Sequence, residues 1–299
     1  MLTRIEQALE RHLAVVATGS APPRLLAAMR HAVFPGGARI RPQLCLAVAR
    51  ACGEDASDLT DAAAVAIELM HCASLVHDDM PCFDDADTRR GQPTVHKRFG
   101  EPLALLAGDA LIVHAYQSLV RVGVAHPARL GPLLMTLGDG VGAPDGIVAG
   151  QAWECEARVS LSRYQRAKTG ALFVASTCAG AQSAGADPAP WRALGECLGE
   201  AYQVADDIRD VLGQADLLGK PVGQDAQHAR PNAAANLGLG GAIEHFETLV
   251  QAAVDAVPTC ASSNAMRGLV RQESERLVPR AACDQFRQSP RITARRMVA

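Results

Sequence analysis

The chain has 299 residues, 48% of them hydrophobic and 20% charged, with a formal net charge of −3 at pH 7. This near-neutral balance gives no reason to expect nucleic acid as a partner, because nucleic-acid-binding domains carry a strongly basic surface. The nine cysteines form no CxxC pair and lie mostly in apolar runs, which is typical of reduced thiols in a cytoplasmic protein.

Helical periodicity dominates the chain, and no period-2 alternation predicts a strand. Residues 62–76 and 193–211 are apolar on nearly every side, which is typical of interior helices. The longest uncharged run, 169–186, is too rich in Ser, Thr, Gln and Gly to span a membrane. No linker or repeat divides the chain, so residues 1–299 are predicted to form one all-α domain, a helical bundle with its site in a central cavity. The predicted helices cover residues 3–16, 22–32, 40–52, 58–78, 101–123, 128–139, 144–158, 161–184, 190–212, 240–256 and 264–277.

Two clusters of aspartates follow or end the two interior helices. The first, DDMPCFDD at 78–85, contains Pro81, which rules out a regular helix there, so its acids lie where a helix gives way to a loop. The second, DDIRD at 206–210, places Asp206 and Asp210 on one helix face. Carboxylates this close repel one another unless they share a cation. Mg²⁺ prefers a few carboxylates plus the phosphate oxygens of a substrate, so the clusters predict a metal–diphosphate site.

Together with the blocks around them, these clusters resemble those of short-chain trans-isoprenyl diphosphate synthases. The blocks are IELMHCASLVH before the first cluster, TRRGQPT after it, YQVADDIRD, and LGKP downstream. The strings FPGGARIRP and RPNA resemble the branch of geranylgeranyl diphosphate synthases that serves carotenoid and bacteriochlorophyll pathways in purple photosynthetic bacteria. The resemblance implies an all-α homodimer that adds isopentenyl diphosphate head-to-tail to dimethylallyl, geranyl or farnesyl diphosphate.

The same resemblance implies a metal site with two or three Mg²⁺ ions. Their charge, with that of Arg and Lys, would neutralise the diphosphate that leaves the allylic substrate. In the first cluster Asp78 and Asp84 are the implied direct ligands, with Asp79 acting through water. In the second cluster the implied main ligand is Asp206, supported by Asp207 and Asp210.

Substrate contacts are implied for a set of basic and polar side chains. Guanidinium groups suit phosphate oxygens because they bind them bidentately. The implied catalytic residues are Lys168, Thr169 and Gln203, which would line the allylic cation and belong to the substrate site. The other implied substrate-binding residues are Arg41, His71 and Arg90 for isopentenyl diphosphate, Arg89 and Lys220 for the allylic diphosphate, and Arg230, which stands where the family usually has Lys.

One departure from the family pattern concerns the isopentenyl diphosphate site. Ala38 stands where the family usually has a phosphate-binding Lys. We expect Arg39 and Arg41 to compensate, at some cost in affinity for isopentenyl diphosphate. Ala38 is also the one feature that favours an alternative, a non-catalytic modulatory subunit. A class I terpene cyclase is disfavoured because aromatic residues make up only 4% of the chain, and such enzymes steer cations with aromatic linings.

Product length is predicted from the residues that precede the first cluster. Ser74 and Ala73 lie four and five positions before Asp78 and would point down the cavity, where farnesyl-forming relatives tend to place an aromatic. Small side chains there allow a tail longer than C15, since each added isoprene needs apolar volume. Met70, one turn deeper, would help to form a floor. We therefore favour a C20 product, with a C15 farnesyl diphosphate synthase as the alternative.

The placement of this pocket is testable by substitution. Ala73→Tyr fills the space below the metal site, so the product is expected to shorten toward C15. Chromatography of the dephosphorylated products measures the shift. An unchanged product profile in this variant would show that the tail does not pass residue 73.

Overall fold

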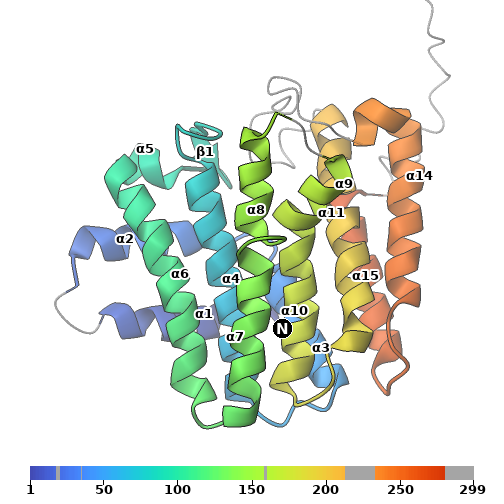
Figure 1. Cartoon of the computed structure of the whole chain (residues 1–299), viewed down its shortest axis with the longest axis horizontal. Coiled ribbons are helices and arrows are strands. Elements are labelled where there is room, and N and C mark those ends of the chain that lie inside the picture. Colours follow the sequence, from blue (N-terminus) through green and yellow to red (C-terminus); the bar gives the residue numbers. More distant parts are fainter. Residues whose placement is uncertain (18–20, 35, 158–159, 213–232, 280–299) are drawn as a thin grey trace, which may run out of the picture.

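The computed structural model describes residues 1–17, 21–34, 36–157, 160–212 and 233–279. Helices make up nearly all of the regular structure in these ranges (Figure 1), which confirms the all-α prediction. The helices are α1 Leu2–Ala17, α2 Pro23–Val33, α3 Ile40–Ala51, α4 Ser57–Asp78, α5 Val95–Phe99, α6 Glu101–Gly123, α7 Pro127–Val141, α8 Ile147–Ala152, α9 Leu161–Gln165, α10 Ala171–Ser183, α11 Arg192–Leu212, α14 Ala233–Asp255 and α15 Ser263–Leu277. The shorter elements are the strands β1 Thr88–Arg89 and β2 Gln92–Pro93, the 3₁₀ turns Trp153–Cys155 and Ala189–Trp191, and the π-helical turn Arg166–Gly170.

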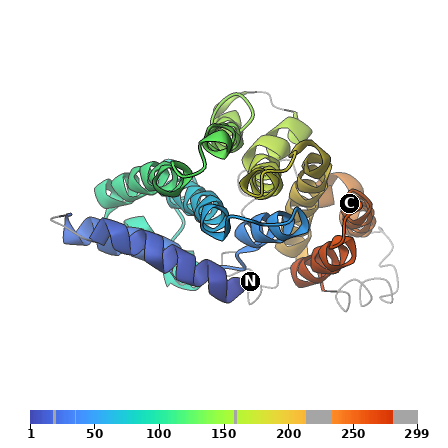
Figure 2. The same ribbon diagram turned by 90° about the horizontal axis from the view of Figure 1, so that it is seen from below.

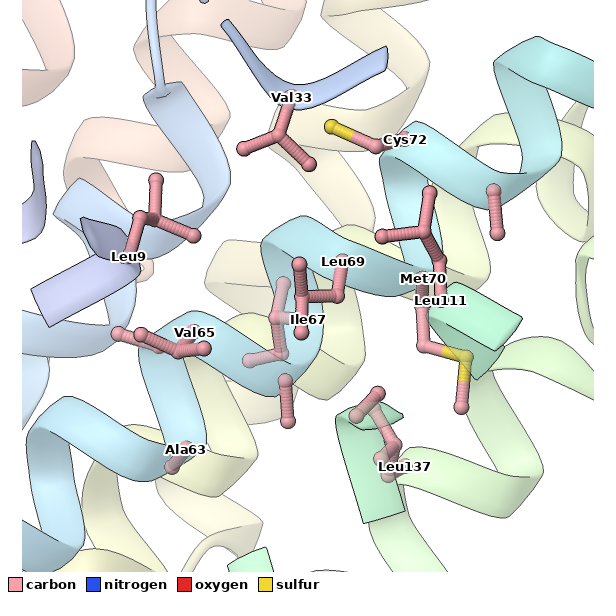
Figure 3. Close-up of a cluster of buried hydrophobic side chains, with 14 of the residues drawn as sticks. Leu9, Val33, Ala63, Val65, Ile67, Leu69, Met70, Cys72, Leu111 and Leu137 are labelled. Carbon is pink, nitrogen blue, oxygen red and sulfur yellow. The ribbon is translucent and has the colours of Figure 1, made fainter. Parts of the chain in front are cut away.

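Helix α4 forms the centre of the bundle. It packs most extensively against α6 and also against α3 and α10, and Figure 2 shows it inside the group of helices. Its side chains are buried on nearly every side, as the apolar run predicted. Figure 3 shows Met70 of α4 beside Leu111 of α6 and Leu137 of α7, and all three are at most 3% exposed. Helix α4 thus shares one hydrophobic core with α1, α6, α7 and α10, while α11, α14 and α15 contribute to two further clusters of buried side chains.

Two of the described helices, α4 and α6, are long and apolar enough to cross a membrane by length and composition alone. In α4, 78% of the most apolar stretch is buried inside the protein, so its composition is that of a core helix. In α6 the buried share is 44%. The difference leaves an exposed apolar face on α6, which is considered below.

Both aspartate clusters lie at one end of the bundle. Helix α4 ends at Asp78, shortly before Pro81, and α11 ends at Leu212, just after the second cluster. These two helix ends lie at the same end of the molecule (Figure 1). Clusters that are far apart in the sequence therefore open onto the same region.

The predicted helix boundaries differ from the structure in a few places. The helix predicted over 161–184 contains the π turn, and the helix predicted over 144–158 consists of α8 and a 3₁₀ turn. The helix predicted from residue 240 begins after a break at Gly238, where φ is 68°. The short helix α5 and the β1–β2 hairpin were not predicted, because elements of five and two residues are too short to show a periodicity.

A buried ion-pair network ties α1, α3 and α4 together. Arg39 donates from Nη1 to Glu68 Oε1 at 2.6 Å and from Nε to Glu6 Oε1 at 2.8 Å. It also donates to the carbonyl oxygen of Val33 at 2.7 Å, and its side chain is fully buried. The expectation that Arg39 compensates for Ala38 is therefore wrong: its guanidinium is committed to carboxylates inside the protein.

This network predicts a large effect of removing one charge. Glu68→Gln leaves the buried Arg39 with Glu6 alone, and uncovering a buried charge in this way costs roughly 3 kcal/mol or more of folding free energy. Urea unfolding measures the loss as a lower midpoint at constant slope. The matched control is Glu10→Gln, which breaks an exposed pair with Arg30 and should cost about 0.5 kcal/mol or less. Equal midpoints for Glu68→Gln and the native protein would contradict the role of the network.

Candidate active site

The loop after α4 folds back onto the end of the helix. The backbone amide of Asp84 donates to the carbonyl of Asp78 at 3.0 Å, and that of Ala86 donates to the carbonyl of Asp79 at 3.1 Å. These bonds satisfy carbonyls that a helix C-terminus otherwise leaves open. They also hold the backbones of Asp78 and Asp84, the two implied direct metal ligands, next to each other.

Asp79, next to Asp78 in the chain, holds Arg89. The guanidinium donates to Asp79 Oδ1 from Nε at 2.8 Å and from Nη2 at 2.5 Å. Burial raises the pKa of Asp79, and the hydrogen bonds from Arg89 offset only part of that rise. The carboxylate of Asp79 thus orients Arg89, the arginine implied in gripping the allylic diphosphate.

The β1–β2 hairpin presents Arg89 and Arg90. Arg90 and Gly91 are the two loop residues, with φ of 54° and 74°. Positive φ at both positions is typical of the tight turn that suits a two-residue hairpin. Such a conformation is unusual for a residue other than glycine and is found at functional sites. Arg90 then reaches Gly37, where an added Cβ would lie 2.9 Å from Arg90 Nε.

Arg41, His71 and Arg90 form a basic cluster. Arg41 is 8% exposed, and its guanidinium lies 4.4 Å from the ring centroid of Phe173 and 5.4 Å from that of Tyr202. Its Nε is buried and lacks a hydrogen-bond partner among the described residues. Burial, followed by the charges of Arg41 and Arg90, lowers the pKa of His71 well below its usual range. An anion bound here would relieve the repulsion between the two guanidinium groups.

The π turn places Lys168 and Thr169 between the two aspartate clusters. Lys168 Nζ lies 3.2 Å from Asp78 Oδ1 of the first cluster. Thr169 Oγ1 donates to Gln203 Oε1 at 3.0 Å, and Gln203 Nε2 donates to Asp207 Oδ1 of the second cluster at 3.0 Å. A π turn changes the direction of side chains within a helix and is common at functional sites. Here it gives adjacent residues contacts with both acidic clusters.

The aspartates of the second cluster differ in their surroundings. Asp207 is 1% exposed and accepts the bond from Gln203. Asp206 keeps a third of its side chain exposed and pairs with Arg209 Nη2 at 2.6 Å. Asp210 is half-buried and follows Asp206 by one helical turn, so both belong to one face. The accessible carboxylates of the second cluster are therefore those of Asp206 and Asp210.

The donor set fits Mg²⁺. No group of three or more metal-binding side chains converges within the described residues. Mg²⁺ does not require one, because it keeps several waters and is bound through one or two carboxylates plus substrate phosphates. Asp78 and Asp206 are half-buried carboxylates near Lys168 and Arg209, and their oxygens are the hard ligands that this ion prefers.

The remaining predicted residues are Lys220, Arg230 and the three chain-length residues of α4. Lys220 and Arg230 lie outside the described residues. Met70 and Ala73 are each 1% exposed and belong to the core of the bundle, and Ser74 Oγ donates to the carbonyl of His71 at 2.9 Å. A cavity near the clusters lies on another face of α4, lined by Cys72, Val76, Asp79, Arg89, Arg90 and Thr94. The predicted channel past residues 70–74 stays a prediction.

The sequence reasoning missed two polar residues of the site, Glu154 and Tyr164. Glu154 Oε1 accepts from Lys168 Nζ at 2.5 Å and from the hydroxyl of Tyr164 at 2.6 Å. The carboxylate also accepts from Gln151 Nε2 at 3.3 Å. The Gly150–Gln151 pair that precedes Glu154 was a possible signal in the sequence. Only the tertiary contact with Lys168 shows that Glu154 belongs to the site.

The chain is similar to several known prenyl diphosphate synthases. A geranylgeranyl diphosphate synthase of Cereibacter sphaeroides is 51% identical over 276 residues, 92% of this chain and 96% of that protein. The corresponding enzyme of Rhodobacter capsulatus is 52% identical over 257 residues, 86% of this chain and 89% of that protein. A farnesyl diphosphate synthase of Geobacillus stearothermophilus is 40% identical over 261 residues, 83% of this chain and 86% of that protein.

Solved structures share the fold. A geranyltransferase from Legionella pneumophila superposes with a TM-score of 0.77 at 26% identity, covering 92% of this chain and 93% of that one. A geranyltransferase from Helicobacter pylori, complexed with magnesium and isoprenyl diphosphate, has a TM-score of 0.73 at 28% identity and covers 95% and 97%. Residues 22–261 match the polyprenyl synthetase family model. The resemblance seen in the sequence is thus confirmed, and this chain belongs to the polyprenyl synthetase family.

Proposed function

We propose that this protein is a Mg²⁺-dependent geranylgeranyl diphosphate synthase that condenses isopentenyl diphosphate with allylic diphosphates. The observation that carries the proposal is the bridge between the aspartate clusters: Lys168 contacts Asp78, and Thr169 connects through Gln203 to Asp207. The bridge suits a substrate whose diphosphate lies between two acidic edges and whose reacting carbon lies beside Thr169 and Gln203. The relatives at 51–52% identity carry the same activity in their names.

The proposed reaction begins with cleavage of the allylic C–O bond, whose electron pair stays with the diphosphate. Bound Mg²⁺, two or three ions in this proposal, supplies charge neutralisation for that leaving group. Lys168 and Arg89 add fixed positive charge to the diphosphate. The oxygen atoms of Thr169 and Gln203 present lone pairs to the allylic cation.

The second substrate is proposed to bind at the basic cluster. Arg41, Arg90 and neutral His71 would hold the diphosphate of isopentenyl diphosphate, whose double bond forms the new C–C bond with the allylic cation. A proton is then lost to the departing diphosphate, because no side-chain base stands out in the sequence. Because Ala38 stands where the family usually has Lys, the positive charge of this cluster comes from Arg41 and Arg90. The affinity for isopentenyl diphosphate should therefore be modest.

Product length is proposed to be C20. Ala73 offers little bulk below Asp78, and Met70 lies against α6 and α7, where it would limit further growth. The 51–52% identical relatives are C20-forming by name, and the farnesyl-forming relative is 40% identical. We further propose that the product serves carotenoid and bacteriochlorophyll-type isoprenoids and that the protein works in the cytoplasm.

We also propose a homodimer, formed through the outer face of α6. Leu106, Val113 and Val120 are 40–55% exposed and repeat every seven residues, which places them on one face of the helix. Leu105 and Val124 extend the apolar area. An apolar stripe of this length on a water-soluble protein is typical of an interface, and a two-fold axis would pair the stripe with itself.

The catalytic proposal is tested by incubating the purified protein with Mg²⁺, isopentenyl diphosphate and either dimethylallyl, geranyl or farnesyl diphosphate. The expected product after dephosphorylation is the linear C20 alcohol, and removal of Mg²⁺ with a chelator should abolish its formation. A C15 alcohol would favour the farnesyl alternative. No product with any primer would favour the modulatory subunit, and a cyclic hydrocarbon would contradict both.

The dimer proposal is tested by placing a charge in the stripe. Val113→Asp should shift the protein from dimer to monomer in sedimentation equilibrium, because an interfacial carboxylate loses its water without gaining a partner. The matched control is Leu2→Asp, at an apolar residue of α1 with similar exposure, which should remain dimeric. A native protein that sediments as a monomer would contradict the proposal.

A further inference from the structure

Glu154 accepts hydrogen bonds from three different side chains beside the aspartate clusters. Its carboxylate accepts from Lys168 Nζ, the Tyr164 hydroxyl and Gln151 Nε2 at 2.5, 2.6 and 3.3 Å. Its side chain is 14% exposed, and Tyr164 is 8% exposed. The proposed function gives Glu154 no task. Three donors converging on one partly buried carboxylate indicate that its position is closely fixed.

The backbone around Lys168 is fixed as well. A Cβ on Gly150 of α8 would lie 2.2 Å from the backbone nitrogen of Lys168, so only a glycine lets α8 approach the π turn this closely. On the other side, a Cβ on Gly199 of α11 would lie 2.5 Å from Cα of Gly170. The π turn is therefore packed closely between α8 and α11. Glu154 lies one helical turn beyond Gly150.

Lys168 contacts two carboxylates, those of Glu154 and Asp78. Its Nζ is 2.5 Å from Glu154 and 3.2 Å from Asp78. A cation that binds Asp78 would repel the ammonium and weaken its attraction to that residue. Glu154 would still attract it, and the ring of Tyr164, whose centroid is 5.9 Å from Nζ, adds a further contact. Without Glu154, Asp78 would be the acidic side chain within 4.0 Å of Lys168 Nζ in the part of the chain that the structure describes.

We propose that Glu154 is a positioning residue that keeps the Lys168 ammonium beside the allylic diphosphate and prevents it from neutralising Asp78. The inference rests on the proposed function, because it assigns Asp78 to a divalent cation and Lys168 to a diphosphate. Glu154 acts through Lys168 and touches neither substrate. The effect is specific to one substrate, since the network reaches the first aspartate cluster and not the basic cluster of Arg41, His71 and Arg90.

Glu154→Gln tests the proposal, with two kinds of readout. In calorimetric titrations of the full-length protein, Mg²⁺ followed by inorganic pyrophosphate should bind roughly 10- to 100-fold more weakly than to the native protein, the range typical for lost outer-shell partners. In steady-state kinetics, KM for the allylic diphosphate should rise and kcat should fall, while KM for isopentenyl diphosphate stays unchanged. Glu156→Gln is the matched control, because it removes the same charge at an exposed site two residues away.

A double-mutant cycle separates positioning from a general structural role. If Glu154 acts through Lys168, then Glu154→Gln should change pyrophosphate binding little in a Lys168→Met background. Glu154→Asp, which keeps the charge, should recover part of the affinity. Tyr164→Phe, a milder change, should weaken binding in the same direction and keeps the test valid if Glu154→Gln does not fold. Additive effects in the cycle, or native-like binding by Glu154→Gln, would overturn the proposal.

The two proposals fail in distinguishable ways. The titration uses Mg²⁺ and pyrophosphate alone, so it reports on Glu154 whether or not the native protein forms a prenyl product. Absence of product with normal pyrophosphate binding would contradict the proposed function and leave Glu154 in its positioning role. A normal C20 product with unaltered binding by Glu154→Gln would contradict the positioning role only.

Discussion

The site depends on the repulsion between neighbouring carboxylates and on how the chain contains it. Asp78, Asp79 and Asp206 each contact a cation from another position: Lys168, Arg89 and Arg209 respectively. These pairs hold the acids in place before any substrate arrives. They also differ in burial, which decides their use. Asp79, whose side chain is 5% exposed, forms a shielded, orienting pair with Arg89, whereas Asp78 and Asp206 keep 14% and 32% of their side chains exposed.

The arginines of the FPGGARIRP block show how burial and partners divide similar side chains into separate roles. Arg39 has a left-handed backbone, a fully buried side chain and two carboxylate partners, so it joins helices. Arg41, two residues later, stacks on Phe173 and Tyr202, and its Nε has no hydrogen-bond partner within the described ranges. A guanidinium paired with two carboxylates already has its charge balanced. One that faces aromatic rings and another arginine is stabilised when an anion binds to it. Arg39 therefore does not replace the positive charge that is missing at Ala38.

The π turn gives the fold its link between the two clusters. A regular helix through residues 161–183 would rotate Lys168 and Thr169 relative to α4 and α11, since each inserted residue turns the following side chains by about 100°. Glycines on both flanking helices permit the close approach that the turn needs. The contacts of Lys168 with Glu154 and of Thr169 with Gln203 thus depend on one local irregularity and the close packing around it.

Periodicity and residue spacing are local properties, so the helical class, most helix bounds and the two aspartate clusters could be predicted from the order of the amino acids. The sequence also identified the family through motifs that lie in order along the chain. It did not determine the pairing of Lys168 with Glu154, the commitment of Arg39 to Glu68, or the left-handed turn at Arg90. These depend on which elements meet in space, and on small differences in burial that decide whether a charge is satisfied by the protein or left for a ligand. Only the tertiary structure sets those differences.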